Sequence, residues 1–568
     1  MARTIAIGEQ DYSKMIKHDY FYVDKTGFLK EWWENGDSVT LITRPRRFGK
    51  TLTLSMVEQF FSIRYAGRSD LFENLEIWKE EAYRKLQGTY PVIYLSFAGI
   101  KADNYEETYY AISRLLAREY RRHAYLLKSD SFLPSDQEQY QKILSGTGNV
   151  SDICSSVNLL CEYLYEYYNR KVLILLDEYD TPMQEAYLNG YWKPIAGFMR
   201  RFMNETFKTN PFAERSLMTG ITRVSKESIF SDLNHLEVVT ATSQKYAAVF
   251  GFTEEEVIQS LDEYGLRDQA DQVRHWYDGF RFGSCAHIYN PWSIIQYLDK
   301  KELAAYWVNT SSNALVGKLI QSGSSQTKKR MEDLMRGHAI CVPIDEQIVF
   351  SQLDKDEDAV FSFLLAGGYL KVQDKQGQEY HLQLVNEEVH QMFEHLINGW
   401  FSECRPAYNY FIKAVLANDL GGMNDFINRV ALSTFSLFDT GQKTSAAAQP
   451  ERFYHGLVLG LMLELRNQYT MTSNRESGFG RYDVLLEPCD RADDGIILEF
   501  KVIQPGTEKN LEETAQAAIR QILDKNYAAV LEASCGRDRI RIYGFAFRGK
   551  EVLIDGGYLR EYEQDPIK

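Results

Sequence analysis

The stretch SVTLITRPRRFGKT, from Ser38 to Thr51, determines the fold of the N-terminal part of the chain. Its first six residues read as a β-strand, and an apolar-periodic helix is predicted from Leu52 to Ile63. Strand, loop and helix in this order form the context of a P-loop, in which backbone N–H groups and the helix N-terminus hold phosphates. In such a loop Lys50 reaches the β- and γ-phosphate oxygens, and the hydroxyl of Thr51 ligates Mg²⁺.

The first position of the loop departs from the usual pattern G-x-x-x-x-G-K-[ST], because this chain has Arg44 there. A residue with a Cβ must fit the tight turn differently from glycine, so the motif needs support from elsewhere in the chain. The residues predicted to contact the nucleotide are Arg44, Arg46, Arg47, Phe48, Gly49, Lys50, Thr51 and Leu52.

That support comes from KVLILLDEYD, Lys171 to Asp180, in which five apolar residues run into Asp-Glu. This Walker B pattern predicts a buried parallel strand whose C-terminal end delivers two carboxylates to the nucleotide. Asp177 would hold Mg²⁺ directly or through water, and Glu178 would activate the hydrolytic water. The two motifs together predict ATP and Mg²⁺ as cofactors.

Two further apolar runs, Val92–Phe97 and Ser216–Gly220, read as buried strands between helical segments. The alternation predicts an α/β fold whose parallel sheet is covered by helices on both faces. In P-loop ATPases with an additional strand, the strand after Walker B ends in a polar residue that senses the γ-phosphate; Thr219 and Thr222 are the candidates. Arg223 would neutralise transition-state charge, in cis or across the subunit boundary of a homo-oligomer, or it forms an ordinary surface ion pair.

Near the C-terminus, the run IILEFKV (Ile496–Val502) contains an acid and a lysine two residues apart. In a strand, Glu499 and Lys501 point to one face while Phe500 packs on the other. The segment Tyr482–Leu486 is also predicted to be a strand. A simple antiparallel hairpin of the two strands places Asp483 directly opposite Glu499. Opposed carboxylates repel each other unless a cation lies between them, so the pair predicts a metal site.

The predicted metal is Mg²⁺, with oxygen ligands from Asp483, Glu499 and the carbonyl group of Phe500. Lys501 would orient a water molecule and help to deprotonate it for attack on a phosphodiester. The alternative is a surface hairpin whose acids and lysine are simply solvated.

These residues lie in a longer pattern, which consists of SNRESGFGRYDVLLEP (Ser473–Pro488), IILEFKV, and a helix with Gln521 followed by Tyr527. The pattern resembles the PD-(D/E)XK nuclease superfamily, which implies a restriction-endonuclease-like α/β domain that acts on nucleic acid. In some branches of that superfamily a Gln and a Tyr at these places line the site.

The resemblance implies that Asp483 and Glu499 bind metal and that Lys501 acts beside them. The superfamily also has an acid on its first helix, which is either Glu464 on an apolar helix or Glu476 in a loop. With this acid undecided, two readings stay open: an active nuclease, or a degenerate nuclease fold that only binds, in an ATP-switched interaction protein.

The N-terminal half resembles the AAA-ATPase-like family, in which Arg at the first loop position is normal. The resemblance leaves two roles for its aromatic motifs, a lid over the nucleotide or plain packing. The matching pieces are YFYVDKTGFL (Tyr20–Leu29), RPRRFGKT, LLDEYDTP (Leu175–Pro182), TGITRVSKESIFSDLN (Thr219–Asn234), FGFTEEEV (Phe250–Val257), WYDGFRFG (Trp276–Gly283) and YNPWSI (Tyr289–Ile294).

Composition sets the outer limits. A chain of 568 residues with 44% hydrophobic and 25% charged residues implies several globular domains. A net charge of −15 argues against avid nonspecific binding of nucleic acid, although a local basic groove stays open. The seven cysteines form no C-x-x-C pair, which argues against the usual zinc sites and for a reducing compartment. Without a long apolar run, we expect a cytoplasmic protein that does not enter a membrane.

The predicted domains are 1–310, an AAA-ATPase-like P-loop domain with its lid; 311–385, a winged-helix-like module; 386–450, a helical bridge and linker; and 451–568, the nuclease-like domain. The predicted function is an ATP-binding and hydrolysing protein coupled to an Mg²⁺-dependent nuclease. A P-loop phosphotransferase for small molecules is the third reading, and Glu178 argues against it because it suits the activation of water.

Overall fold

The computed structural model describes residues 2–129, 132–222, 230, 233–307, 314–345, 353, 356–400, 405–428, 465, 468–477, 480–503, 508–548 and 551–563. Within these ranges, the side chains of 314, 321–322, 325, 398–400, 405–409, 473–477 and 480–483 are not described. The chain forms two compact units, which are Met1–Val316 with Gly337–His390, and Gly317–Arg336 with Gln391–Lys568.

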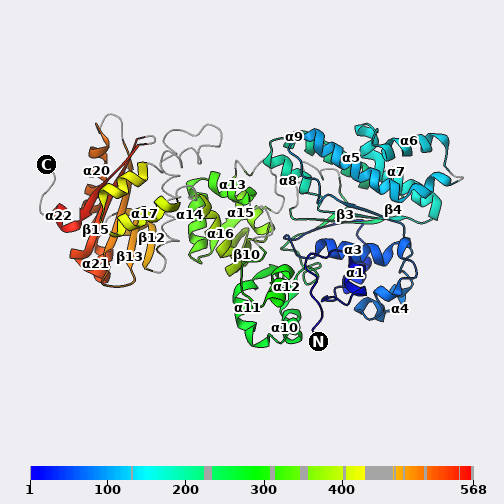
Figure 1. Ribbon diagram of the computed structural model, residues 1–568. Coiled ribbons are helices and arrows are strands. Elements are labelled where there is room, and N and C mark those ends of the chain that lie inside the picture. The colour runs from blue at the N-terminus through cyan, green and yellow to red at the C-terminus, as the bar shows by residue number, and fades with distance from the viewer. Residues whose placement is uncertain are drawn as a thin grey trace. The chain divides into compact units, whose positions relative to one another are not determined.

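A five-stranded parallel sheet is the centre of the first unit (Figure 1). Its strands are β1 (Val39–Thr43), β2 (Val92–Ser96), β3 (Val172–Asp177), β4 (Ala213–Gly220) and β5 (Leu236–Val239), in the order β2-β3-β4-β1-β5. The strand β4 lies between the P-loop strand β1 and the Walker B strand β3, so the predicted additional strand is present. Every residue of β1 and β3 is buried, as expected for strands covered on both faces.

Helices cover both faces of this sheet, as predicted (Figure 1). One group contains α1 (Tyr12–Lys17), α3 (Lys50–Phe61) and α4 (Glu81–Arg84), and α2 (Gly27–Asn35) lies between them in the sequence. The other group contains α5 (Tyr105–Arg122), α6 (Pro134–Ser145), α7 (Val150–Tyr168), α8 (Thr181–Leu188) and α9 (Trp192–Phe207). The predicted helix after the P-loop is therefore confirmed, and it begins two residues earlier, at Lys50.

A small sheet with three helices follows in the same unit. The strands β6 (Phe252–Thr253), β8 (Cys285–Tyr289) and β7 (Phe280–Phe282) lie in that order, beside α10 (Glu254–Glu263), α11 (Ala270–Tyr277) and α12 (Pro291–Lys300). Ten buried side chains form their core, and one of them, Phe21, comes from the N-terminal segment. The aromatic motifs that follow Walker B in the sequence thus build one packed cluster.

The segment after this cluster covers residues 311–385, which were predicted to form a winged-helix-like module. Its elements are α13 (Ala314–Ser322), α14 (Ser325–Met335), β9 (Ile340–Pro343), α15 (Glu357–Ala366), β10 (Leu370–Gln376) and β11 (Glu379–Leu384). The three strands pair in the order β10-β11-β9. Residues 348–350 of this segment lie outside the described residues. The winged-helix interpretation and the bounds of the four predicted domains remain predictions.

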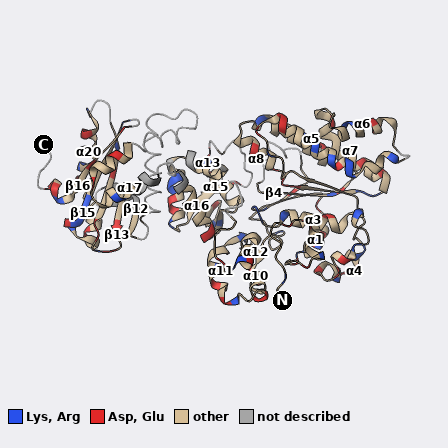
Figure 2. Ribbon diagram, in the orientation of Figure 1, with Lys and Arg blue, Asp and Glu red and all other residues tan. Residues whose placement is uncertain are grey.

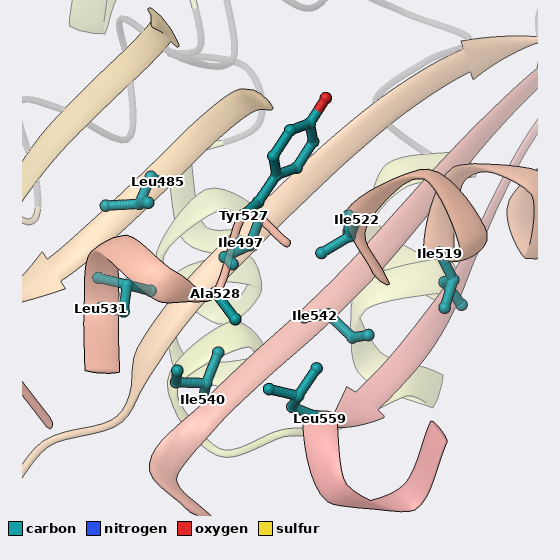
Figure 3. Close-up of a cluster of buried hydrophobic side chains, with 10 residues drawn as sticks. All are labelled: Leu485, Ile497, Ile519, Ile522, Tyr527, Ala528, Leu531, Ile540, Ile542 and Leu559. Carbon is teal, nitrogen blue, oxygen red and sulfur yellow. The ribbon is translucent and has the colours of Figure 1, made fainter. Parts of the chain in front are cut away.

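A mixed five-stranded sheet is the centre of the second unit. Its strands are β12 (Tyr469–Ser477), β13 (Gly480–Pro488), β14 (Gly495–Val502), β15 (Ile540–Arg548) and β16 (Glu551–Tyr558), in sequence order. Only the β14–β15 pair is parallel, and α20 (Leu511–Asp524) makes the crossover between these two strands. Figure 3 shows the apolar cluster that joins the sheet to α20, α21 (Ala529–Cys535) and α22 (Leu559–Glu563).

The predicted hairpin of β13 and β14 is confirmed. The prediction that Glu476 lies in a loop is wrong, because Glu476 belongs to β12 and is paired with Arg481. Its neighbours favour a loop by propensity, but backbone pairing with β13 outweighs that preference.

Helices before the nuclease-like sheet belong to the second unit. These are the end of α16 (Glu387–Trp400), α17 (Arg405–Leu416) and a helical segment over residues 420–428. The amide of Asn424 exchanges two hydrogen bonds with the backbone of Ile554, and Asn428 does the same with Val552. These contacts cover the exposed side of the edge strand β16. The predicted linker 439–449 lies outside the described residues.

Charge is distributed over the whole surface. Figure 2 shows acidic and basic residues interspersed along the helices of both units. Within the part of the chain that the structure describes, no helix combines the length and the apolar character needed to cross a membrane.

Candidate nucleotide and nuclease sites

The P-loop turns sharply into α3. Two of its residues have left-handed backbone conformations, Arg47 with φ 66° and Gly49 with φ 80°. Glycine adopts this conformation without cost, whereas a residue with a Cβ loses about 1–2 kcal/mol. The loop holds Arg47 in this conformation next to the predicted phosphate site, which is where such strain concentrates in proteins.

Arg44, the unusual first residue of the loop, is fully buried and has a structural role. Its guanidinium donates hydrogen bonds to the carbonyl oxygens of Thr43 at 2.9 Å and Thr240 at 2.8 Å. It also lies 4.4 Å from the ring centre of Phe282, a cation–π contact. Burial lowers the pKa of Arg44 to about 9. Arg44 was predicted to contact the nucleotide, but its side chain points into the core and is not among the described residues that line the cavity over the loop.

Lys50 and Thr51 occupy the first turn of α3, at the centre of the predicted site. The ammonium of Lys50 donates to the carbonyl oxygens of Arg44 at 2.9 Å and Pro45 at 2.7 Å. Burial lowers the pKa of Lys50, whose exposed fraction is 5%. The hydroxyl of Thr51 donates to the carboxylate of Asp177 at 2.8 Å, so the P-loop and the Walker B strand meet as predicted.

Asp177 is the last residue of β3, and three hydroxyl groups surround it. Besides Thr51, Thr219 donates to its other oxygen at 2.6 Å, and Ser96 lies 3.5 Å away. Burial raises the pKa of Asp177. Carboxylate and hydroxyl oxygens are the ligands that Mg²⁺ prefers, so this donor set fits the predicted ion.

Glu178 follows with a left-handed backbone conformation, φ 50°, and its side chain lines the cavity. Its backbone N–H donates to the hydroxyl of Thr219 at 3.4 Å, and its carboxylate accepts from Thr181 at 3.3 Å. The turn after β3 therefore separates the two acids of the Walker B motif. Asp177 faces Thr51, and Glu178 faces the cavity.

The sensor candidates differ in their surroundings. Thr219, at the end of β4, lies beside Asp177, close to the predicted phosphate site. Thr222 lies further along, where its backbone N–H and its hydroxyl both donate to Asp180 at 2.9 Å. Arg223 lies outside the described residues.

A cavity of about 490 Å³ lies over the loop, within the first unit. Its volume is in the range of small-molecule sites. Basic side chains outnumber acidic ones in its lining, and apolar side chains line it as well, a mixture that suits a nucleotide. The basic residues are Lys25, Arg46, Arg47, Lys50 and Lys101; the acidic ones are Glu9, Glu178 and Glu185; apolar ones include Met15, Phe21, Val23, Phe252 and Trp292.

The aromatic motifs hold the loop from outside. The carbonyl oxygen of Arg46 accepts hydrogen bonds from Asn290 at 3.3 Å and from the indole of Trp307 at 3.0 Å. The guanidinium of Arg47 lies 4.4 Å from the ring centre of Trp292. The aromatic motifs therefore pack against the P-loop and also line the cavity. Both roles that the resemblance left open have support.

Lys25 lines the cavity, and no role was predicted for it from the sequence. Its ammonium pairs with Glu256 at 2.7 Å and donates to the carbonyl oxygen of Ala248 at 2.8 Å. Glu256 also caps the N-terminus of α10 by accepting from the backbone of Thr253. Lys25 thus fixes the small aromatic cluster to the edge of the cavity. The one sequence feature that pointed to a role for Lys25 is its place in the motif Tyr20–Leu29, which is rich in aromatic and charged residues.

The second site lies in the nuclease-like sheet. The paired residues of β13 and β14 end at Val484 and Leu498, one residue before Asp483 and Glu499, so the opposition of the two acids remains a prediction. Phe500 points away from Glu499 and stacks on Phe545 at 4.6 Å, as the alternation of a strand requires.

Glu499 is buried, with an exposed fraction of 2%, and its carboxylate accepts a hydrogen bond from the amide of Gln521 on α20. The same amide lies 3.5 Å from the hydroxyl of Tyr527, whose ring packs in the core of the domain (Figure 3). Gln521 on α20 therefore reaches the E-x-K strand, whereas Tyr527, which was predicted on the same helix, lies in the turn after it and contacts Gln521. Lys501 is half-buried on the same strand.

The structure leaves part of this site undescribed. The side chains of Asp483 and Glu476 and the whole of Glu464 lie outside the described residues. Among the side chains that are described, no three His, Cys, Asp or Glu residues form a group that would hold a metal ion. The buried carboxylate of Glu499 is a hard oxygen donor of the kind that Mg²⁺ takes.

Comparisons with known proteins match the two regions separately. Residues 6–230 match the family model of predicted AAA-ATPases, and residues 449–556 match that of the PD-(D/E)XK nuclease superfamily. The chain thus contains an AAA-ATPase-like region and a C-terminal PD-(D/E)XK superfamily region. It is 24% identical over 548 residues to an uncharacterized protein in the vnfD 5′ region of Azotobacter chroococcum mcd 1, which covers 93% of each chain. Both resemblances noted in the sequence are thus confirmed at the level of the family.

Proposed function

We propose that the AAA-ATPase-like domain binds and hydrolyses ATP and that this reaction controls Mg²⁺-dependent cleavage of nucleic acid by the PD-(D/E)XK domain. The observation that carries the first half is the meeting of the P-loop and the Walker B strand at one cavity. Thr51 and Asp177 lie 2.8 Å apart there, and Lys50 and Glu178 line the cavity above them.

In the first reaction, Lys50 binds the β- and γ-phosphate oxygens and the loop N–H groups hold the chain of phosphates. Glu178 accepts a proton as water attacks the γ-phosphorus. The bond from that phosphorus to the β–γ bridging oxygen breaks, and ADP and inorganic phosphate leave. When bound, Mg²⁺ supplies charge neutralisation between the phosphates, and Thr51 and Asp177 are the residues that would hold it.

In the second reaction, Lys501 orients the attacking water while Gln521 fixes the carboxylate of Glu499. The oxygen of the water bonds to phosphorus as one phosphorus–oxygen bond of the phosphodiester breaks, and the leaving oxygen takes up a proton, which gives a phosphate monoester and an alcohol. When bound, Mg²⁺ supplies Lewis acidity, and Asp483 and Glu499 would hold it.

A chain of hydrogen bonds that leads from the P-loop to the helix α16 supports the proposed control of one site by the other. The indole of Trp307 bonds to the P-loop at Arg46, and the backbone N–H of Trp307 donates to Glu388 at 2.6 Å. Glu388 also accepts from Ser293 at 2.8 Å. It lies in the first turn of α16, a helix that begins in the first unit and ends in the second. A shift of the loop on nucleotide binding therefore has a direct route to that helix.

The test uses the full chain. Phosphate release from ATP without added acceptor is measured for the wild type, Lys50→Ala and Glu178→Gln. Cleavage of single- and double-stranded DNA and RNA with Mg²⁺ or Mn²⁺ is measured for the wild type, Glu499→Gln and Lys501→Ala. We expect both activities in the wild type and loss of each in its own variants. Phosphate release only when a small acceptor is added would support a phosphotransferase instead, and nucleic-acid binding without metal-dependent cutting would support a switched binding protein.

A further inference from the structure

The three arginines of the P-loop have three different environments. Arg44 is fully buried among carbonyl oxygens, and Arg47 is exposed and lies over Trp292. Arg46 lines the cavity, and its guanidinium donates to the side-chain oxygen of Gln184 at 3.2 Å. Arg46 and Arg47 both line the cavity, and of the two it is Arg46 whose guanidinium is fixed there by a hydrogen bond to a side chain.

The partner of Arg46 is neutral, and its orientation is fixed. The amide nitrogen of Gln184 donates to Asp180 at 2.9 Å, so its oxygen must face Arg46. Gln184 has an exposed fraction of 7%, and Asp180 is itself held by the backbone N–H groups of Ile221 and Thr222. The end of β4 and the helix α8 thus position the guanidinium of Arg46 from behind.

The charge of Arg46 is not neutralised by its surroundings. Among the described residues, no carboxylate oxygen lies within 4.0 Å of its guanidinium, and Gln184 occupies only part of its five N–H donors. Its charge also acts on Lys50, whose pKa burial lowers, although the carboxylates of Glu178, Asp177 and Asp180 each act on Lys50 more strongly and in the opposite direction. Arg46 and Lys50 line the same cavity, and two cations there favour a ligand with negative charge.

The backbone of Arg46 is fixed as well, by the hydrogen bonds that its carbonyl oxygen accepts from Asn290 and Trp307. An arginine whose backbone and guanidinium are both held by hydrogen bonds is preorganised for a phosphate group. We propose that Arg46 is a catalytic residue supplied in cis, whose guanidinium contacts the γ-phosphate of ATP and neutralises the charge that develops there during hydrolysis. The inference rests on the proposed ATPase function and adds to it the residue that performs the role first considered for Arg223.

The chemistry gives this role a specific signature. ADP has no γ-phosphate, so removal of the Arg46 guanidinium should weaken the binding of ATP and leave that of ADP nearly unchanged. The rate should fall further than the affinity, because charge on the γ-phosphoryl oxygens and the bridging oxygen is redistributed as the bond breaks. A residue that only supported the loop would weaken both nucleotides alike.

The experiment compares Arg46→Gln and Arg46→Lys with Arg64→Gln and with Lys50→Ala; Arg64 is the control, an exposed arginine after the end of α3 that does not line the cavity. Dissociation constants for ATP and ADP with Mg²⁺ and steady-state kcat are measured on the full chain. For Arg46→Gln we expect kcat to fall by about 100- to 1,000-fold, the Kd of ATP to rise about tenfold or more, and the Kd of ADP to stay within about twofold. Arg46→Lys should recover part of kcat, because it restores the charge without the planar fork. Arg64→Gln should keep kcat within about threefold.

The outcomes separate the inference from the proposed function. If the wild type neither binds nor hydrolyses ATP, the proposed ATPase function and the role of Arg46 are both refuted. If the wild type is active and Arg46→Gln retains its kcat and its preference for ATP over ADP, the inference is overturned while the ATPase function stands. Equal loss of ATP and ADP affinity in Arg46→Gln also overturns it, since that result assigns the residue to loop structure. Should Arg46→Gln unfold, the ATP-to-ADP affinity ratio of Arg46→Lys decides the same question.

Discussion

Replacement of Arg44 by alanine tests whether the unusual first residue of the P-loop stabilises the fold. Its buried guanidinium donates to the carbonyl oxygens of Thr43 at 2.9 Å and Thr240 at 2.8 Å and lies 4.4 Å from the ring centre of Phe282. Arg44→Ala removes both donors. The two carbonyl groups then lose these charged partners in a region from which water is excluded.

The magnitude follows from these contacts. A hydrogen bond from a charged donor contributes about 1.5–3 kcal/mol, and a desolvated cation–π contact contributes about 2 kcal/mol. The cost of burying the arginine charge offsets part of this sum. We therefore expect the free energy of unfolding of the first unit to fall by about 3–5 kcal/mol in Arg44→Ala.

Urea titration of the full chain, followed by circular dichroism and tryptophan fluorescence, measures this change. Arg47→Ala is the matched control, because Arg47 is exposed and its contact with Trp292 should contribute less than about 1 kcal/mol. If Arg44→Ala is as stable as Arg47→Ala, the structural role assigned to Arg44 is refuted.

Three further predictions concern the sites and their supports. Glu178→Gln should bind ATP with Mg²⁺ as the wild type does but lose at least about 100-fold in kcat, and an unchanged rate of phosphate release would exclude Glu178 as the base. Burial raises the pKa of Glu388 from 4.5 to about 7, so the folded state binds more protons in this range and stability falls as pH rises from 4.5 to 7, by at most about 1.4 kcal/mol per pH unit. Urea titrations from pH 5 to 8 should show this fall in the wild type and a smaller one in Glu388→Gln; equal slopes would contradict it. A Cβ on Gly544 would lie 2.4 Å from the carbonyl oxygen of Ala515. Gly544→Ala should therefore displace α20, destabilise the second unit by about 1–3 kcal/mol and, by moving Gln521, impair cutting. A melting temperature equal to that of the wild type would contradict this, because it would show that the helix adjusts freely.

Much of the framework could be predicted from the chain itself, because a parallel sheet covered on both faces requires nearly continuous apolar strands. The runs that became β1 and β3 are of this kind, and each is followed at once by its chemistry, Lys50 and Thr51 after the first, Asp177 and Glu178 after the second. The pairing of β13 with β14 was likewise predictable, because a symmetric hairpin fixes which residues are paired, whereas the opposition of Asp483 and Glu499 stays a prediction.

Contacts between distant parts of the sequence could not be predicted in this way. Arg44 donates a hydrogen bond to Thr240, which lies 196 positions later in the sequence, and Arg46 donates one to Gln184, which lies 138 positions later. Nothing in the loop distinguishes its three arginines; only the tertiary packing does. The placement of Glu476 failed for a related reason, because a polar segment with poor strand propensity becomes a strand when its backbone pairs with a neighbouring strand.

The central claim is that one chain contains two phosphate-handling sites and that the first controls the second. The most direct test is the rate at which the full chain cuts a labelled nucleic acid in Mg²⁺, with and without ATP, for the wild type and Lys50→Ala. We predict that ATP changes the cutting rate of the wild type by at least about fivefold, the lower end of typical coupling between sites, and that it leaves Lys50→Ala unaffected. A cutting rate that ATP does not change in the wild type, or that it changes equally in Lys50→Ala, would contradict the account.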